Sequence, residues 1–173
     1  MLAKAETLVK ELEKFCKSLG GKPEKIAWDF GCIVSPEKVL ENWNEFLDLL
    51  EKSKGNPEIS TIYFGEKESY FYYHPERAMG GFRLSKYIPK VLEDEEMAEL
   101  YEDIESEFWD FMHKRGIEPE FHFIPSVDVG EWEGKTYIDV EAEVIQPELG
   151  NLKKIAKAML NFRRKLNKLI RKY

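Results

Sequence analysis

The sequence predicts a two-layer α+β fold, with about five mostly antiparallel strands and four helices. Three observations support this prediction. Four segments place apolar residues at the three- and four-residue spacing of a helix, and the runs between them alternate as strands. Two pairs of these runs flank short glycine-containing turns, as hairpins do. The chain is 173 residues long and 43% hydrophobic, enough for one core. We expect a single domain, 1–173, in the order α-β-α-β-β-α-β-β-α.

The first half of the chain is expected to contain two helices and three strands. Residues 3–19 have helical periodicity and end at a glycine pair, which favours a helix C-cap. Residues 25–34 alternate as one strand. A serine followed by proline opens the second helix, 35–53, because the hydroxyl caps the helix and proline suits its first turn. Two β-rich runs, 58–64 and 68–74, then form a hairpin.

The second half is expected to contain two helices and two strands. Residues 75–92 include a glycine pair and two prolines, so we interpret them as irregular. A third helix covers 94–115. A second hairpin joins 119–128 to 135–145 through a glycine-bounded turn. A basic amphipathic helix, 151–173, ends the chain.

Composition favours a cytoplasmic protein without a membrane partner. No stretch free of Asp, Glu, Lys and Arg exceeds seven residues, whereas a spanning helix needs about 20 apolar ones. The N-terminal residues mix charges with leucines and lack a signal-peptide core. Charged residues make up 34%, and Gln146 is the sole glutamine, a composition typical of hyperthermophile proteins.

The two cysteines, Cys16 and Cys32, lie in an expected helix and an expected strand. We interpret them as small buried hydrophobic residues in a reducing compartment. A bridge between them remains open, because intracellular proteins of thermophiles sometimes carry disulfides.

The charge is unevenly distributed along the chain. The net charge is −7, yet residues 151–173 hold nine Lys or Arg and no acid, which leaves 17 bases against 33 acids, or −16, on residues 1–150. Residues 93–110 hold ten acids and no base. The last helix also carries a heptad seam. The seam residues are Leu152, Ile155, Met159, Phe162, Leu166, Leu169 and Tyr173.

Three interpretations of the basic helix are open. It is an ordinary core helix whose charges are solvated or paired with 93–110, or a nucleic-acid surface, or a homodimer interface formed by the seam. The nucleic-acid candidates on the helix are Lys153, Lys154, Lys157, Arg163, Arg164, Lys165, Lys168, Arg171 and Lys172. A second basic patch would comprise Arg77, Arg83 and Lys86, beside the tyrosines Tyr70 and Tyr72 on which bases would stack. The simpler interpretation makes these tyrosines core residues.

The second hairpin offers the one candidate for metal or acid–base chemistry. Asp139, Glu141 and Glu143 alternate on one strand, and Glu120 and His122 alternate on the other. A turn near residue 132 would place His122 opposite Glu143, and carboxylates with an imidazole can hold a divalent metal for hydrolysis. Alternating acids on a strand are more often a solvated face.

No phosphate-binding loop, dinucleotide fingerprint, zinc-type cysteine spacing or nucleophile elbow is present, so no cofactor is expected. The leading hypothesis is a small non-enzymatic binding or assembly module that contacts nucleic acid through its basic helix and loop. A homo-oligomer built on the heptad seam and a metal-dependent hydrolase are the alternatives.

Overall fold

The computed structural model describes residues 2–173 and has one seven-stranded sheet, in the order β1-β2-β3-β4-β5-β7-β6. Neighbouring strands are antiparallel except for the parallel pair β2–β3. The predicted α+β class is confirmed, although the sheet has two more strands than expected. The strands are β1 (Lys22–Ile26), β2 (Asp29–Ile33), β3 (Thr61–Glu66), β4 (Ser69–His74), β5 (Met79–Ile88), β6 (Ile124–Trp132) and β7 (Lys135–Ile145).

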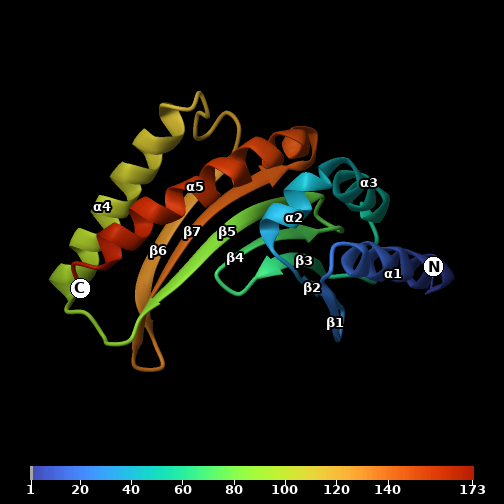
Figure 1. Cartoon of the computed structure of the whole chain (residues 1–173), viewed down its shortest axis with the longest axis horizontal. Coiled ribbons are helices and arrows are strands. Elements are labelled where there is room, and N and C mark those ends of the chain that lie inside the picture. The colour runs from blue at the N-terminus through green and yellow to red at the C-terminus, as the bar shows by residue number, and fades with distance from the viewer. Residues whose placement is uncertain (1) are drawn as a thin grey trace.

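The described helices all lie on one side of the sheet (Figure 1). They are α1 (Leu2–Ser18), α2 (Pro36–Glu41), α3 (Trp43–Ser53), α4 (Asp94–His113) and α5 (Leu152–Ile170), with a 3-10 turn η1 (Gln146–Asn151) before α5. α1 contacts β1 and β2, α2 contacts β3 and β4, α5 contacts β5, and α4 contacts β6. None of these helices is long and apolar enough to cross a membrane.

The core lies between the helices and one face of the sheet. Alternate strand residues such as Phe64, Phe71 and Phe82 are fully buried there. Their rings meet helix residues, and the Phe46 and Phe64 ring centroids are 5.1 Å apart. Because side chains alternate along a strand, every other residue points to the opposite face, which no described helix covers. We call it the helix-free face.

The expected single strand 25–34 is wrong, because it is a hairpin formed by β1 and β2. Its turn is formed by Ala27 and Trp28, and Ala27 has a positive φ of 52° without being glycine. Trp28 continues the apolar alternation in the sequence, yet 70% of it is exposed. The turn therefore changes the face on which the following residues lie.

The expected irregular segment 75–92 is also wrong, because most of it is strand β5. A Cβ atom at Gly80 would lie 2.8 Å from the Tyr72 carbonyl oxygen. At Gly81 it would lie 2.3 Å from the Ala142 carbonyl oxygen. The glycine pair therefore allows close packing in the sheet instead of breaking it. The helix expected over 35–53 is likewise divided, into α2 and α3, at Asn42, which leaves helical geometry with φ −121° and ψ 38°.

The two cysteines form a disulfide, so the interpretation as free buried thiols is wrong. Cys16 near the end of α1 is bonded to Cys32 in β2, with Cα atoms 5.8 Å apart. A Cβ at Gly21 would lie 2.6 Å from the Cys32 sulfur. The glycine that was expected to cap the first helix also makes room for this bridge.

Candidate binding face of the sheet

The apolar seam of α5 is occupied within the chain. Leu152, Ile155, Met159, Phe162 and Leu166 are all buried, each with an exposed fraction of 1% or less. The Phe162 ring lies 5.3 Å from the Phe108 ring of α4, centroid to centroid. Five of the seven seam residues are therefore core, and Leu169 and Tyr173 are partly buried against it.

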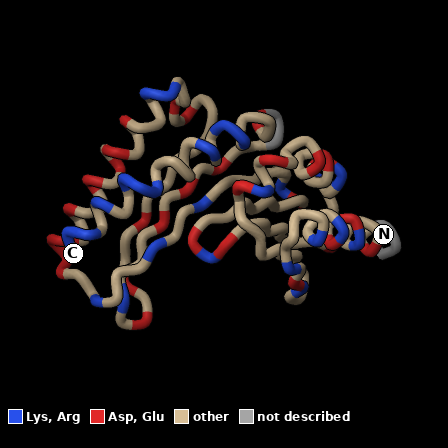
Figure 2. The backbone as a smooth tube through the Cα atoms, viewed as in Figure 1, with Lys and Arg blue, Asp and Glu red and all other residues tan. Residues whose placement is uncertain are grey.

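The positive charge of α5 and of the residues after it is partly balanced by neighbouring acids. Lys165 forms an ion pair with Glu107 at 3.1 Å, Lys172 lies 4.0 Å from Asp103, and Arg163 donates a hydrogen bond to Glu37 at 2.8 Å. Figure 2 shows the acidic α4 running beside the basic α5. α4 carries nine acids and α5 carries seven bases, so the pair has a charge of 7 − 9 = −2. The exposed candidates are Lys153, Lys154, Lys157, Arg164, Lys165, Lys168, Arg171 and Lys172.

The second basic patch is not assembled. Arg83 lies on the helix-free face, opposite Glu141 of β7. Lys86 is an odd number of residues further along β5, so it faces the other way, and its amine pairs with Glu68 at 2.6 Å. Arg77 is exposed in the turn between β4 and β5. The three cations therefore occupy three different places.

Arg83 instead completes a cluster at the centre of the helix-free face. Its guanidinium carbon lies 5.8 Å from the Tyr70 ring centroid and 5.7 Å from that of Tyr72. It donates hydrogen bonds to the Tyr70 hydroxyl at 3.0 Å and to a Glu141 carboxylate oxygen at 3.2 Å. Arg83 was expected in an irregular loop beside the tyrosines, whereas it lies on strand β5, where its own chain already holds it.

Burial and charge set the ionisation of this cluster. Burial disfavours the charged form of Arg83, but Tyr70 and Glu141 outweigh it and raise the pKa of Arg83 above its ordinary value. Burial, and then the Glu141 carboxylate, raises the pKa of Tyr72. In the described residues, the Tyr72 hydroxyl and the Arg83 Nε are buried without a hydrogen-bond partner. The cluster therefore holds one cation between two neutral rings.

The expected metal cluster is wrong. β6 begins at Ile124, and Ile124 takes the place opposite Glu143 that was expected for His122. Glu120 has a positive φ of 77°, and the His122 Nδ1 accepts a hydrogen bond from the Glu118 amide at 3.0 Å, so this segment turns before the strand begins. Within residues 2–173, no three His, Cys, Asp or Glu side chains are placed to hold a metal ion.

The acids of β7 have other roles. Asp139 accepts a hydrogen bond from the Ser85 hydroxyl at 2.7 Å, and Glu141 accepts the one from Arg83. Asp128 of β6 accepts a hydrogen bond from the Tyr137 hydroxyl at 3.1 Å. Asp128, Asp139, Glu141 and Glu143 all point to the helix-free face from β6 and β7, and we call these four carboxylates the acidic strip.

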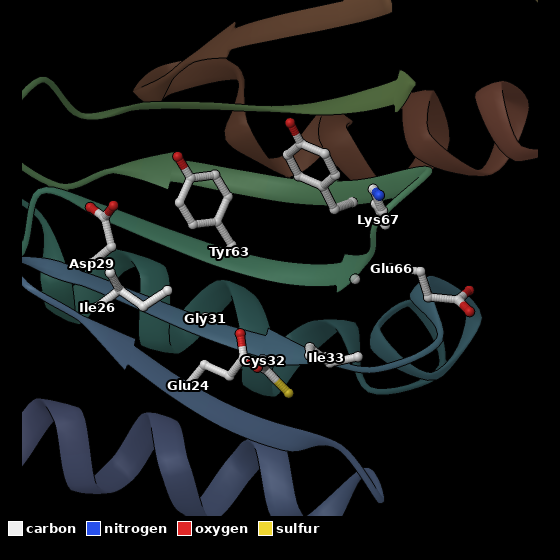
Figure 3. Close-up of a pocket in the computed structure, with 11 residues that line it drawn as sticks. Glu24, Ile26, Asp29, Gly31, Cys32, Ile33, Tyr63, Glu66 and Lys67 are labelled. Atoms are coloured by element: carbon white, nitrogen blue, oxygen red, sulfur yellow. The ribbon is translucent and has the colours of Figure 1, made fainter. Parts of the chain in front are cut away.

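A pocket of about 270 Å³ lies on the same face, over β1 to β4 (Figure 3). Tyr63, Tyr70, Ile26 and Ile33 supply its apolar lining. Glu24, Asp29, Glu66 and Lys67 are its charged lining residues. We call this the tyrosine pocket. Sequence reasoning did not predict it, because its walls come from strands whose pairing has no local signal.

Two glycines leave room for the tyrosine pocket. Gly31 in β2 and Gly65 in β3 both line it. A Cβ at Gly31 would have a single neighbour within 4 Å, the Glu24 carbonyl oxygen at 3.8 Å. Gly65 has a φ of +151°, and a Cβ there would lie 2.5 Å from the Tyr70 Cα. Gly31 therefore keeps the pocket open, while Gly65 lets β4 approach β3.

Comparison with known protein families, curated proteins and solved structures finds no match to this chain.

Proposed function

We propose that the protein is a non-enzymatic binding module, and that its helix-free face binds an extended polypeptide that is positively charged and partly apolar. The observation that carries the proposal is the combination, on one uncovered sheet face, of exposed large apolar side chains with an excess of carboxylates. Each feature restricts the partner in a different way.

The apolar side chains favour a macromolecular partner. Isolated exposed hydrophobic residues are ordinary, whereas several on one face mark an interaction site. The strand alternation and pairing put seven large exposed side chains on the helix-free face. They are Ile26, Ile33, Tyr63, Tyr87, Ile124, Trp132 and Ile145.

The charge of the face favours a cationic partner. At strand positions pointing to this face there are six acids and three bases, giving 3 − 6 = −3. The acids are Glu24, Asp29, Asp128, Asp139, Glu141 and Glu143, and the bases are Lys22, Arg83 and Lys135. Such a surface repels phosphate and a second copy of itself, and it attracts a basic segment.

The test is a fluorescence anisotropy titration with a labelled peptide of alternating arginine and valine. About 12 extended residues at ~3.3 Å each reach roughly 40 Å, enough to cross seven strands ~4.8 Å apart. We expect binding at ~50 mM salt that weakens at ~200 mM, because exposed charges are screened. A peptide of alternating glutamate and valine is the sign control and should not bind.

Matched charge reversals locate the binding. Glu143→Lys changes the acidic strip, and Glu102→Lys makes the same change at an exposed position on α4. We expect the first to weaken arginine–valine binding roughly tenfold and the second to have no effect. Equal effects of the two variants, or no peptide binding at the lower salt, would refute the proposal.

Nucleic acid is the second candidate partner. Lys153, Lys154 and Lys157 are exposed and form no ion pair with any described residue, which favours this candidate. Titration with single- and double-stranded DNA and RNA at the same two salt concentrations tests it. A triple lysine-to-glutamine variant should then weaken the binding and lower the slope of affinity against salt concentration by roughly three. If the variant and the wild type give the same titration curves, these lysines do not bind nucleic acid.

A further inference from the structure

We infer that the tyrosine pocket is a binding site for an alkyl cation, with the chemistry of an arginine or lysine side chain. The inference rests on the proposed function and specifies it, because it assigns one residue type of the basic partner to one site. The pocket is also open to a free small cation of the same chemistry, and the experiment below separates these two sources.

The tyrosine rings supply the first part of the argument. The ring centroids of Tyr63 and Tyr70 are 5.8 Å apart, with the planes inclined at 66°. Tyr63 is 36% exposed, and its ring stands at the pocket in Figure 3. The face of an aromatic ring carries negative electrostatic potential and attracts ammonium and guanidinium groups. The Arg83 guanidinium carbon lies 5.8 Å from the Tyr70 ring centroid, so this chain already places a cation beside such a ring.

Unpaired carboxylates supply the second part. Glu24, Asp29 and Glu66 line the pocket and form no ion pair with any described residue, while Lys67 is the one basic side chain in the lining. The lining charge is therefore 1 − 3 = −2. A neutral ligand would take these carboxylates partly out of water without compensation, whereas a cation pairs with them. An anion is repelled.

The size and the apolar walls supply the third part. Pockets for drug-sized ligands run from about 300 to 1,000 Å³, and this one, at about 270 Å³, suits a single side chain. Ile26 and Ile33 offer contacts for the methylene stem, as long cationic side chains bury their stems against apolar surface. A compact, fully hydrated ion would not use these walls.

The test is a two-dimensional NMR titration of the whole chain with N-acetyl-arginine amide. The control probe is N-acetyl-citrulline amide, which has the same shape without the charge. We expect saturable shifts of the Gly31, Tyr63 and Gly65 amide resonances, with a dissociation constant near millimolar, and at least tenfold weaker binding of citrulline. A dissociation constant for the arginine amide above roughly 10 mM, or equal affinity for the two probes, would overturn the inference.

A cavity-filling variant ties binding to the pocket. Gly31→Val adds a β-branched side chain to a strand position that has open space, so it is expected to fold and to fill the pocket. Ser126→Val makes a similar change on the same face, outside the pocket lining. We expect Gly31→Val to abolish binding of the arginine amide and Ser126→Val to preserve it. Thermal unfolding of both variants checks that each is folded.

The outcomes for the pocket and for the proposed function are distinguishable. If Gly31→Val also weakens the arginine–valine peptide at least tenfold, the cation comes from the polypeptide and both proposals stand. If the amide binds in the pocket but the peptide binds nowhere, the site takes a free small cation and the proposed function is wrong. If the peptide binds wild type and Gly31→Val equally, the inference is wrong and the proposed function stands.

Discussion

Two glycines in adjacent strands of one pocket have opposite physical roles. Gly31 has an ordinary strand conformation and open space where a side chain would be. Gly65 has a backbone conformation that favours glycine, and the next strand occupies its side-chain position. The same residue type therefore reserves a ligand space at one position and permits strand packing at the other.

These roles predict opposite effects of alanine at the two positions. Gly65→Ala should lower the free energy of unfolding by about 2 kcal/mol or more, because a strained φ and a clash with Tyr70 both act against the folded state. Gly31→Ala should be neutral or stabilise by roughly 0.5–1 kcal/mol, since glycine weakens a strand. Urea denaturation measures both. Similar losses from the two variants would contradict the assignment.

Tyr73 predicts a loss of stability at alkaline pH. Burial, with the charge of Glu51, raises the pKa of Tyr73 from 10.0 to about 12. The unfolded chain therefore loses this proton first, so the contribution is complete below about pH 10 and declines as the pH rises toward 12. Two pKa units correspond to roughly 2–3 kcal/mol.

The measurement for Tyr73 is urea unfolding of the wild type and of Tyr73→Phe between pH 8 and pH 11. The free energies of unfolding of the two proteins should diverge above about pH 10. Tyr73→Phe should remove this part of the pH dependence, and Tyr87→Phe, at a residue 46% exposed, should leave it. Parallel pH profiles for wild type and Tyr73→Phe would show that another group titrates.

At the scale of elements, α5 has two structural roles, an apolar stripe in the core and a charged stripe at the surface, and its sequence alone does not show where each stripe lies in the fold. Its apolar stripe belongs to the core, where Phe162 also meets Phe111 with ring centroids 5.3 Å apart. Its charged stripe is partly neutralised by α4 and by Glu37 of α2. A heptad seam is a pattern of apolar spacing, and that spacing suits the chain's own sheet as well as a second helix.

The assignment of the seam to the core predicts unfolding when it is disrupted. Leu166→Asp places a carboxylate at a position with no exposed surface, and the loss should exceed about 4 kcal/mol, comparable to the whole stability of many domains. Arg164→Asp, on the exposed stripe, should remain folded. Circular dichroism and analytical ultracentrifugation report the two results. If the wild type is a dimer and Leu166→Asp is a soluble, folded monomer, the seam is a dimer interface and its assignment to the core is wrong.

The sequence predicted the helices better than the strands, for a physical reason. Helical periodicity is local, and both α4 and α5 lie close to their expected bounds. The turn between β1 and β2 uses Ala27 at positive φ, a residue without a turn signal. The strand β5 contains a glycine pair whose purpose appears only when the neighbouring strands are present. The strand count was therefore too low.

For the candidate sites too, local features could be predicted from the sequence and long-range contacts could not. The alternation of Tyr70 and Tyr72 along one strand is local and placed both on one face, but Arg83 was expected in an irregular loop and not on the neighbouring strand that brings it beside them. The partner of Arg83, Glu141, lies 58 residues away, and nothing near Arg83 in the sequence indicates it. The tyrosine pocket depends on the parallel pairing of β2 with β3, which is equally remote.

At the scale of the whole molecule, the two faces of the sheet differ in kind. One face is covered by helices and forms the core, and the other is covered by no described helix and carries apolar side chains among acids. Net charge keeps such a surface apart from its copies, since like-charged faces repel. The solubility of the protein therefore depends on its ionisation.

This dependence predicts self-association near the isoelectric point. The sequence pI is about 5.2, so the net charge that separates the molecules disappears near that pH. Sedimentation velocity should give one monomeric species near pH 8 and larger species near pH 5. The double variant Ile33→Glu, Ile124→Glu should shift the onset to lower pH. Equal sedimentation at both pH values would show that the face is not adhesive.

The bridge between Cys16 and Cys32 has a consequence for a chain that has been cut. Cys16 and Cys32 are 16 positions apart in the sequence, and the loop between them contains the whole β1–β2 turn and Lys25, an exposed residue after which a trypsin-like protease cleaves. A single cut there leaves two fragments joined through sulfur, so a nicked molecule migrates as one intact chain until a reductant separates it. Damage at this exposed edge is therefore not seen by electrophoresis without a reductant, and α1 stays attached to the sheet while the bridge holds.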